Sequence, residues 1–132
     1  MIDTSTRIVG RFRGKEEGPL MVVTAAMHGN EPAGVEALDR VFEILELESV
    51  KNPLFKFKGE LIGLIGNLPA YIQGKRYITK DINRSWDKGF IEKIRTASKE
   101  DLHFEDLEIR EILDTIDLEI LRINPNKIYV CS

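Results

Sequence analysis

One segment constrains the fold more than any other: the largely apolar run from Leu20 to Ala26, which leads directly into a His-Gly-Asn-Glu-Pro turn. Such a run is typical of a strand that is buried on both faces of a sheet. Pro32 suits the first turn of a helix. Apolar residues then recur at helical spacing to about Glu48, at Val35, Leu38, Val41, Phe42 and Leu45. The segment therefore predicts a strand, a tight turn and a helix that packs on the sheet.

The rest of the chain continues this alternation and predicts an α/β domain. The segments read as strand, strand, helix, strand, loop, helix and strand, over residues 7–13, 20–26, 32–48, 59–66, 69–88, 105–121 and 127–132. The first segment alternates apolar and polar residues, as an edge or half-buried strand does. We expect it to form a hairpin with the second strand through residues 14–18.

His28 and Glu31 lie where the predicted strand meets the helix. Imidazole nitrogen and carboxylate oxygen both bind Zn²⁺ at about 2.0–2.2 Å, and hydrolytic zinc usually takes three protein ligands and a water. The same residues also suit a plain turn, in which Gly29 supplies backbone freedom, Asn30 caps the helix and Glu31 favours its positive end. Taken alone, the pair leaves both readings open.

Two further motifs lie downstream. An Asn-x-x-Ala turn begins at Asn67, and an Arg-Tyr-Ile-x-x-Asp-x-Asn-Arg segment begins at Arg76. Together with the His-Gly-Asn-Glu turn, they resemble the succinylglutamate desuccinylase and aspartoacylase family, zinc-dependent amidohydrolases related in fold to the zinc carboxypeptidases. The resemblance runs from about Ile8 to the end of the chain. It implies a partial three-layer α/β/α sandwich with a mixed, largely parallel sheet.

The resemblance also implies a role for each matching residue. His28 and Glu31 would be zinc ligands, and Arg76 would polarise the scissile acyl carbonyl and stabilise its oxyanion. Asn83 and Arg84 would hold a carboxylate of an N-acyl amino acid, which a planar guanidinium can bind in bidentate fashion. The implied reaction is hydrolysis of the amide bond of that substrate by zinc-bound water.

Three expectations follow from the same comparison. Asp81, between the two arginines, should orient them. The third zinc ligand of the family, a histidine, would fall two or three residues past Ser132, and the glutamate base would lie further on. We therefore expect residues 1–132 to be the N-terminal part of a deacylase catalytic domain without its C-terminal half, to bind zinc weakly or not at all, and to be inactive.

Two other residues could in principle supply the missing ligand. His103 lies in a polar segment that suits a solvated helix start. Cys131 is chemically better, since thiolate binds zinc well, but a small buried apolar residue is the more common fate of a lone cysteine. Neither residue is expected to bind the metal.

The loop from Lys75 to Lys88 supports a second reading from another class of function. It carries five basic residues and the aromatic residues Tyr77 and Trp86. A non-catalytic binding module could use this loop for an anionic or nucleic-acid ligand, by charge and stacking. The loop could equally be a solvated surface segment.

Composition favours one globular domain in the cytoplasm. The sequence contains no apolar stretch long enough to span a bilayer and no signal-peptide pattern. A net charge of -3 gives no general attraction to nucleic acid or anionic membrane, so a small molecule is the expected partner. An uncovered last strand at 128–130 would favour self-association or a homo-oligomer.

Overall fold

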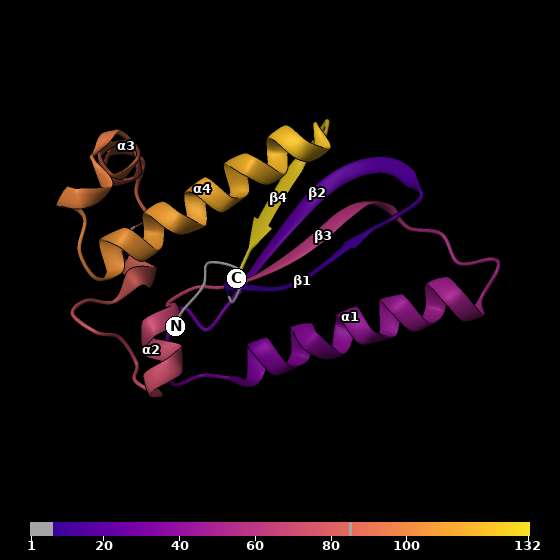
Figure 1. Ribbon diagram of the computed structural model, residues 1–132, viewed down its shortest axis with the longest axis horizontal. Coiled ribbons are helices and arrows are strands. Elements are labelled where there is room, and N and C mark those ends of the chain that lie inside the picture. The colour runs from indigo at the N-terminus through magenta and orange to yellow at the C-terminus, as the bar shows by residue number, and fades with distance from the viewer. Residues whose placement is uncertain (1–6, 85) are drawn as a thin grey trace.

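The computed structural model describes residues 7–84 and 86–132 (Figure 1). The strands are β1 (Ile8–Arg13), β2 (Glu16–Ala25), β3 (Lys58–Ile65) and β4 (Ile128–Cys131). The α-helices are α1 (Ala33–Lys51), α2 (Leu68–Gln73), α3 (Lys88–Thr96) and α4 (Glu105–Ile123), and short 3-10 helices span Ile82–Arg84 and Lys99–Asp101. The predicted α/β class is confirmed.

The four strands form one mixed sheet in the order β1-β3-β2-β4. β2 pairs in parallel with β3 on one side and with β4 on the other, whereas β1 pairs antiparallel with β3. The predicted hairpin between the first two strands is wrong, because β3 lies between them. β3 is buried along nearly its whole length and takes an interior position, while β1 carries Arg11 and Arg13 and lies at the edge.

Helices cover both faces of the sheet, which gives three layers (Figure 1). On the face toward α1, the buried core consists of Phe12, Ala25, Leu38, Phe42 and Leu61. On the face toward α4, a larger core includes Leu20, Val22, Ile62, Leu64, Ile109, Ile112 and Ile116. The predicted three-layer arrangement, with a largely parallel sheet in the middle, is therefore confirmed.

Two helices lie where the sequence did not predict them. The Asn67 side chain accepts a hydrogen bond from the Ala70 N–H, and Pro69 lies in the first turn, so α2 begins directly after β3. Asp87 caps α3 in the same way through the Phe90 N–H. With six residues, α2 is too short to show a helical period in the sequence, and only its cap marks it.

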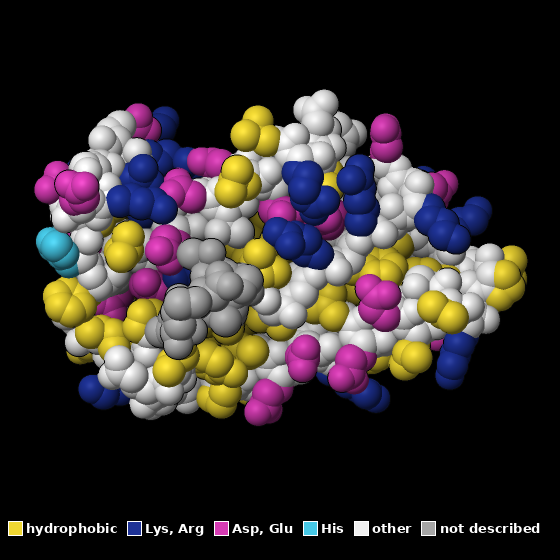
Figure 2. Space-filling model, viewed as in Figure 1, with side chains coloured by type: hydrophobic (Ala, Val, Ile, Leu, Met, Phe, Trp, Pro, Cys, Tyr) yellow, Lys and Arg dark blue, Asp and Glu magenta, His cyan; other side chains and the backbone are white. Residues whose placement is uncertain are grey.

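Apolar side chains remain at the surface on two elements. Along the lower edge of Figure 2, where Figure 1 places α1, hydrophobic and acidic side chains lie side by side. The most exposed apolar residues of this helix are Leu47 and Val50, and β4 is exposed throughout. Self-association through these surfaces stays a prediction. No helix among the described residues is long and apolar enough to cross a bilayer.

A charged cluster joins α4 to β3 and β1. Arg122 donates hydrogen bonds to Glu60 Oε1 at 2.5 Å and to Glu119 Oε2 at 2.8 Å. Arg11 donates from Nε to Glu119 Oε1 at 2.8 Å. Burial and the neighbouring Glu119 carboxyl raise the pKa of Glu60 to about 6. Burial also opposes ionisation of Glu119, but its hydrogen bonds with Glu60, Arg122 and Arg11 outweigh it and lower the pKa of that carboxyl.

We predict that Glu60→Gln raises the free energy of unfolding at pH 8, by on the order of 1 kcal/mol, and changes it little at pH 5. A carboxyl with a raised folded-state pKa is stabilising while protonated, and that stability is lost as pH rises from about 4.5 through about 6. Glutamine mimics the protonated form at every pH. Urea unfolding at the two pH values measures the difference.

The matched control is Glu119→Gln, in the partner carboxyl of the same cluster. Its pKa is lowered in the folded state, so its charge stabilises the protein above the unfolded value, and the substitution should lower stability at pH 8. If Glu60→Gln instead destabilises the protein equally at pH 8 and pH 5, the pKa of Glu60 is not raised in the folded protein.

Candidate metal and substrate site

The His-Gly-Asn-Glu turn places His28 just beyond the carboxyl end of β2. His28 Nδ1 lies 2.9 Å from Glu31 Oε2, and His28 Nε2 lies 3.0 Å from Asp81 Oδ1. The side chains of His28 and Asp81 are largely buried, whereas that of Glu31 is 63% exposed. Each ring nitrogen therefore faces one carboxylate, one from the same turn and one from a segment more than fifty residues away.

Gly29 lets this turn lie directly against α2 and the loop that follows it. A Cβ atom at this position would come within 2.2 Å of the Ala70 carbonyl carbon and 2.4 Å of the Lys75 oxygen. The Gly29 N–H donates to the Arg76 carbonyl oxygen at 3.0 Å. A side chain at residue 29 would force the His28 turn away from the loop.

Asp81 contacts the histidine, a contact that sequence reasoning missed. One carboxylate oxygen of Asp81 contacts the His28 ring nitrogen. The same oxygen accepts a hydrogen bond from the Asn83 N–H at 3.0 Å. The Arg76 guanidinium lies 3.7 Å from the other oxygen, so the predicted contact with that arginine is a loose one. The hydrogen bond with His28 is the main cause of the lowered pKa of Asp81.

The predicted catalytic residue, Arg76, and the two predicted substrate-binding residues, Asn83 and Arg84, all lie in the 75–88 segment. The Arg76 side chain is 54% exposed and reaches toward Asp81. Asn83 is exposed and lines, together with Glu31, a cavity of about 520 Å³ between the end of β2 and α1. Arg84 ends the 3-10 helix that begins at Ile82, and its side chain lies outside the part of the chain that is described.

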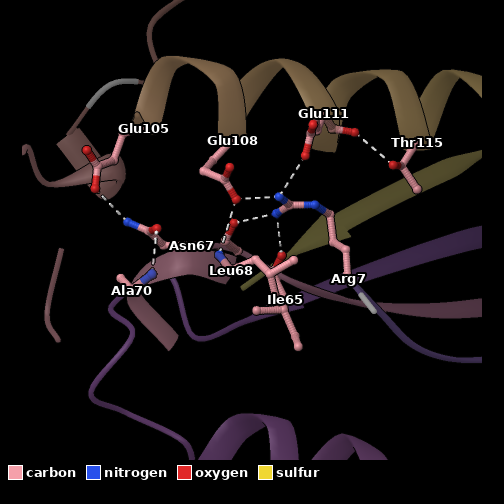
Figure 3. Close-up of polar contacts among 10 residues, drawn as sticks. Arg7, Ile65, Asn67, Leu68, Ala70, Glu105, Glu108, Glu111 and Thr115 are labelled. Atoms are coloured by element: carbon pink, nitrogen blue, oxygen red, sulfur yellow. Dashed lines mark hydrogen bonds and ion pairs between the residues drawn. The ribbon is translucent and has the colours of Figure 1, made fainter. Parts of the chain in front are cut away.

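The Asn67 side chain contacts α4. It is fully buried, and its Nδ2 donates to Glu105 Oε2 at 2.9 Å (Figure 3). Glu105 also accepts hydrogen bonds from the backbone N–H groups of Ile78, Thr79 and Lys80 and from the Thr79 hydroxyl. Burial opposes ionisation of this carboxyl, but the hydrogen bonds outweigh it and lower the pKa of Glu105 to about 2.

His28 and Glu31 fit a metal ion as a pair. Their facing atoms are 2.9 Å apart, close to the about 3.3 Å that separates two ligands of a tetrahedral zinc ion. A carboxylate on the second ring nitrogen, as Asp81 provides, is the usual partner of a zinc-binding histidine. Among residues 7–84 and 86–132, however, no group of three His, Cys, Asp or Glu side chains is arranged to hold a metal.

The two other candidate ligands, His103 and Cys131, are both exposed. His103 is exposed in the segment before α4. Cys131 is an exposed free thiol on β4, so the prediction that it is buried is wrong. β4 has a neighbouring strand on one side only, which leaves the Cys131 side chain open to solvent.

Some basic residues of the 75–88 loop form contacts with other residues of the protein. Lys80 forms an ion pair with Asp106 and lies over the Phe90 ring, 4.6 Å from its centre. Arg76 faces the Asp81 carboxylate. These contacts neutralise part of the positive charge that would attract an anionic ligand. The loop geometry therefore does not support the hypothesis that the loop binds an anionic or nucleic-acid ligand.

Sequence comparison points to one group of proteins. The family described as the succinylglutamate desuccinylase/aspartoacylase catalytic domain matches residues 17–122. Succinylglutamate desuccinylases of Yersinia pestis (strain Pestoides F) and Pseudomonas putida (strain GB-1) are 41% and 39% identical to this chain over 64 residues. The aligned part is 48% of this chain and 18% of each relative, so the match spans less than a fifth of those proteins.

Solved structures of the same kind share the fold. The succinylglutamate desuccinylase of Chromobacterium violaceum aligns with 96% of this chain and 42% of its own, with a TM-score of 0.58 and 17% identity. That of Vibrio cholerae aligns with 88% of this chain and 30% of its own, with a TM-score of 0.52 and 16% identity. Since the family match covers most of the sequence, the chain belongs to the succinylglutamate desuccinylase/aspartoacylase catalytic domain family.

Proposed function

We propose that this chain supplies two zinc ligands and the substrate-carboxylate contacts of a deacylase that hydrolyses the amide bond of an N-acyl amino acid. The observation that carries the proposal is the placement of His28 between two carboxylates, with Glu31 on Nδ1 and Asp81 on Nε2. Family membership supports the reaction class, and the relatives named succinylglutamate desuccinylases support an acidic N-acyl amino acid as substrate.

We assign the role of zinc ligand to both members of the metal pair, His28 and Glu31, and an orienting role to Asp81. In the proposed metal-bound site, the Nε2–H of His28 would donate to Asp81, which would select the tautomer whose Nδ1 lone pair faces the metal on the side of Glu31. His28 Nδ1 and the Glu31 carboxylate would then be the ligands. Zinc bound there would supply a water of lowered pKa for attack on the acyl carbon.

The substrate contacts come from the loop that carries Asp81. Arg76 is half exposed beside the metal pair, where its guanidinium can donate to the acyl oxygen as negative charge develops on it. Asn83 lines the cavity that also contains Glu31, where its amide can donate to a substrate carboxylate. We propose that the guanidinium of Arg84, the residue after Asn83, binds the same substrate carboxylate.

We further propose that a third ligand and the general base come from protein outside residues 1–132. In the parallel register of β2 and β4, Val23 lies opposite Cys131. A strand continuing two or three residues past Ser132 would therefore run level with Ala26 and Met27, directly beside His28. This arrangement supports the expectation that the chain is the N-terminal part of the catalytic domain.

Zinc titration tests the ligand assignment. Isothermal titration calorimetry of the metal-free chain should show one weak zinc site, because two ligands hold the ion only loosely. His28→Ala and Glu31→Gln should each abolish it. Asp81→Asn should weaken it about 10–100-fold, since the ring would lose the carboxylate that orients it.

The control for this titration is His103→Ala, which removes the other histidine of the chain. It should leave the zinc affinity unchanged, because His103 is exposed in the segment before α4 and is not one of the proposed ligands. Zinc binding that survives His28→Ala but not His103→Ala would show that the ligand assignment is wrong.

Turnover by the isolated chain gives a separate prediction. With zinc present, we expect no measurable release of amine from N-succinylglutamate or N-acetylaspartate, because a general base is typically worth about 10²–10⁴-fold and this chain is proposed to lack one. An assay of free amine measures the outcome. Zinc-dependent turnover that disappears in Glu31→Ala would mean that the chain completes its own site.

A further inference from the structure

We infer that Glu105 is a positioning residue, whose buried carboxylate holds the 78–80 segment in the shape that sets Asp81 against His28. The inference rests on the proposed role of His28 as a metal ligand. Glu105 does not touch the metal pair itself. It lies in the first turn of α4 and acts through the backbone of the loop.

The carboxylate of Glu105 accepts hydrogen bonds from several donors at once. Oε1 accepts hydrogen bonds from the Thr79 N–H at 2.9 Å, the Thr79 hydroxyl at 2.6 Å and the Lys80 N–H at 3.2 Å. Oε2 accepts from the Ile78 N–H at 2.7 Å and from Asn67 Nδ2 at 2.9 Å. Three consecutive backbone N–H groups thus point at one carboxylate, as they do in anion-binding turns.

The charge of Glu105 is essential to this arrangement. Its side chain is fully buried, and a buried carboxylate is tolerated only when hydrogen bonds replace the water it loses. A glutamine of the same shape has one acceptor oxygen, and its NH₂ group would face N–H donors. Replacing the anion would therefore leave part of the loop backbone without acceptors.

The 78–80 segment leads directly to the metal pair. Lys80, held by Glu105 through its N–H, is followed by Asp81, whose carboxylate meets His28 Nε2 at 3.0 Å. At the other end of the loop, the Arg76 carbonyl is held by the Gly29 N–H. The loop backbone is therefore held near both ends, and Glu105 holds the end next to Asp81.

Glu105 also links the loop to the sheet. Asn67, at the end of β3, donates to Glu105 and caps α2 with the same side chain (Figure 3). The loop, α2 and the end of β3 are therefore positioned against one residue of α4. A change at Glu105 should reach Asp81 and His28 even though it makes no contact with His28.

Glu108 offers a matched control, because it lies one turn further along the same helix. It is also buried, and it accepts hydrogen bonds from Arg7 and from the Leu68 N–H (Figure 3). Among the described residues, it forms no hydrogen bond with the 78–80 segment. A merely structural role for Glu105 predicts that Glu105→Gln and Glu108→Gln behave alike. A positioning role predicts that they differ at His28.

The first readout is zinc affinity, measured by competition with a chromophoric chelator under conditions where both variants are folded. Glu105→Gln should weaken zinc binding about 10–100-fold, the range found when the support of a ligand is removed. Glu108→Gln should stay within about threefold of the parent. Parent affinity in Glu105→Gln, or equal weakening in both variants, would overturn the inference.

The second readout needs no metal and separates this inference from the proposed function. In long-range ¹H–¹⁵N spectra of the metal-free chain, the His28 ring signals of Glu105→Gln should move toward those of Asp81→Asn, while Glu108→Gln leaves them in place. If the parent binds no zinc, the proposed function fails, and these spectra still decide the role of Glu105. Unmoved His28 signals in Glu105→Gln would refute it.

A milder variant covers the case in which Glu105→Gln does not fold. Thr79→Val removes only the hydroxyl donor and leaves the backbone bond of the same residue. It should shift the His28 ring signals in the same direction and weaken zinc binding severalfold. Signals and affinity identical to those of the parent would count against the inference.

Discussion

The ionised carboxylate of Glu105 is the interaction on which the candidate site depends. It joins α4 to Asn67, which follows β3 and caps α2, and to the 78–80 segment, all of them 25 to 38 residues earlier in the sequence. Ordering a loop costs about 1–2 kcal/mol of backbone entropy per residue, and loop 75–81 has few apolar side chains to offset it. A buried anion that accepts five hydrogen bonds offsets part of that cost and also selects one loop shape.

Buried carboxylates that accept hydrogen bonds recur along α4. Its buried face carries three carboxylates, and each contacts a different part of the chain outside the helix: Glu105 contacts the loop, Glu108 contacts Arg7 just before β1, and Glu119 contacts Arg11 in β1. Arg7 in turn donates to the Ile65 and Gly66 carbonyl oxygens at the end of β3. Buried ion pairs add little net stability over apolar packing. We take their main effect to be the fixed register of α4 on the sheet, which holds the loop over the carboxyl ends of β2 and β3.

Much of the fold could be predicted from the sequence, because hydrophobic periodicity reflects burial directly. The apolar run before His28 became β2, and the spacing from 105 to 121 became α4. Strand pairing could not be predicted in this way. Local pattern marked β1 as an edge strand but carried no signal that β3 would come between it and β2.

The same distinction applies to the site: contacts within one turn could be predicted from the sequence, and contacts between distant segments could not. The pair His28 and Glu31 lies within one turn, so its spacing was visible. The contact of Asp81 with His28 spans 53 residues and depends on the fold of the loop. Glu105 was missed because acidic residues are normally assigned to the solvent face of a helix. A signal did exist: Glu105 shares its helix face with Ile109, Ile112 and Ile116, at spacings of four, three and four residues.

The most direct test of the account is the position of zinc in crystals of the chain soaked with the metal, located by anomalous scattering at the zinc edge. The account predicts a peak between His28 Nδ1 and the Glu31 carboxylate, with the Asp81 carboxylate still on Nε2 of the same ring. A peak bound at His28 Nε2 in place of Asp81, or peaks at His103 or Cys131 with none at His28, would contradict it.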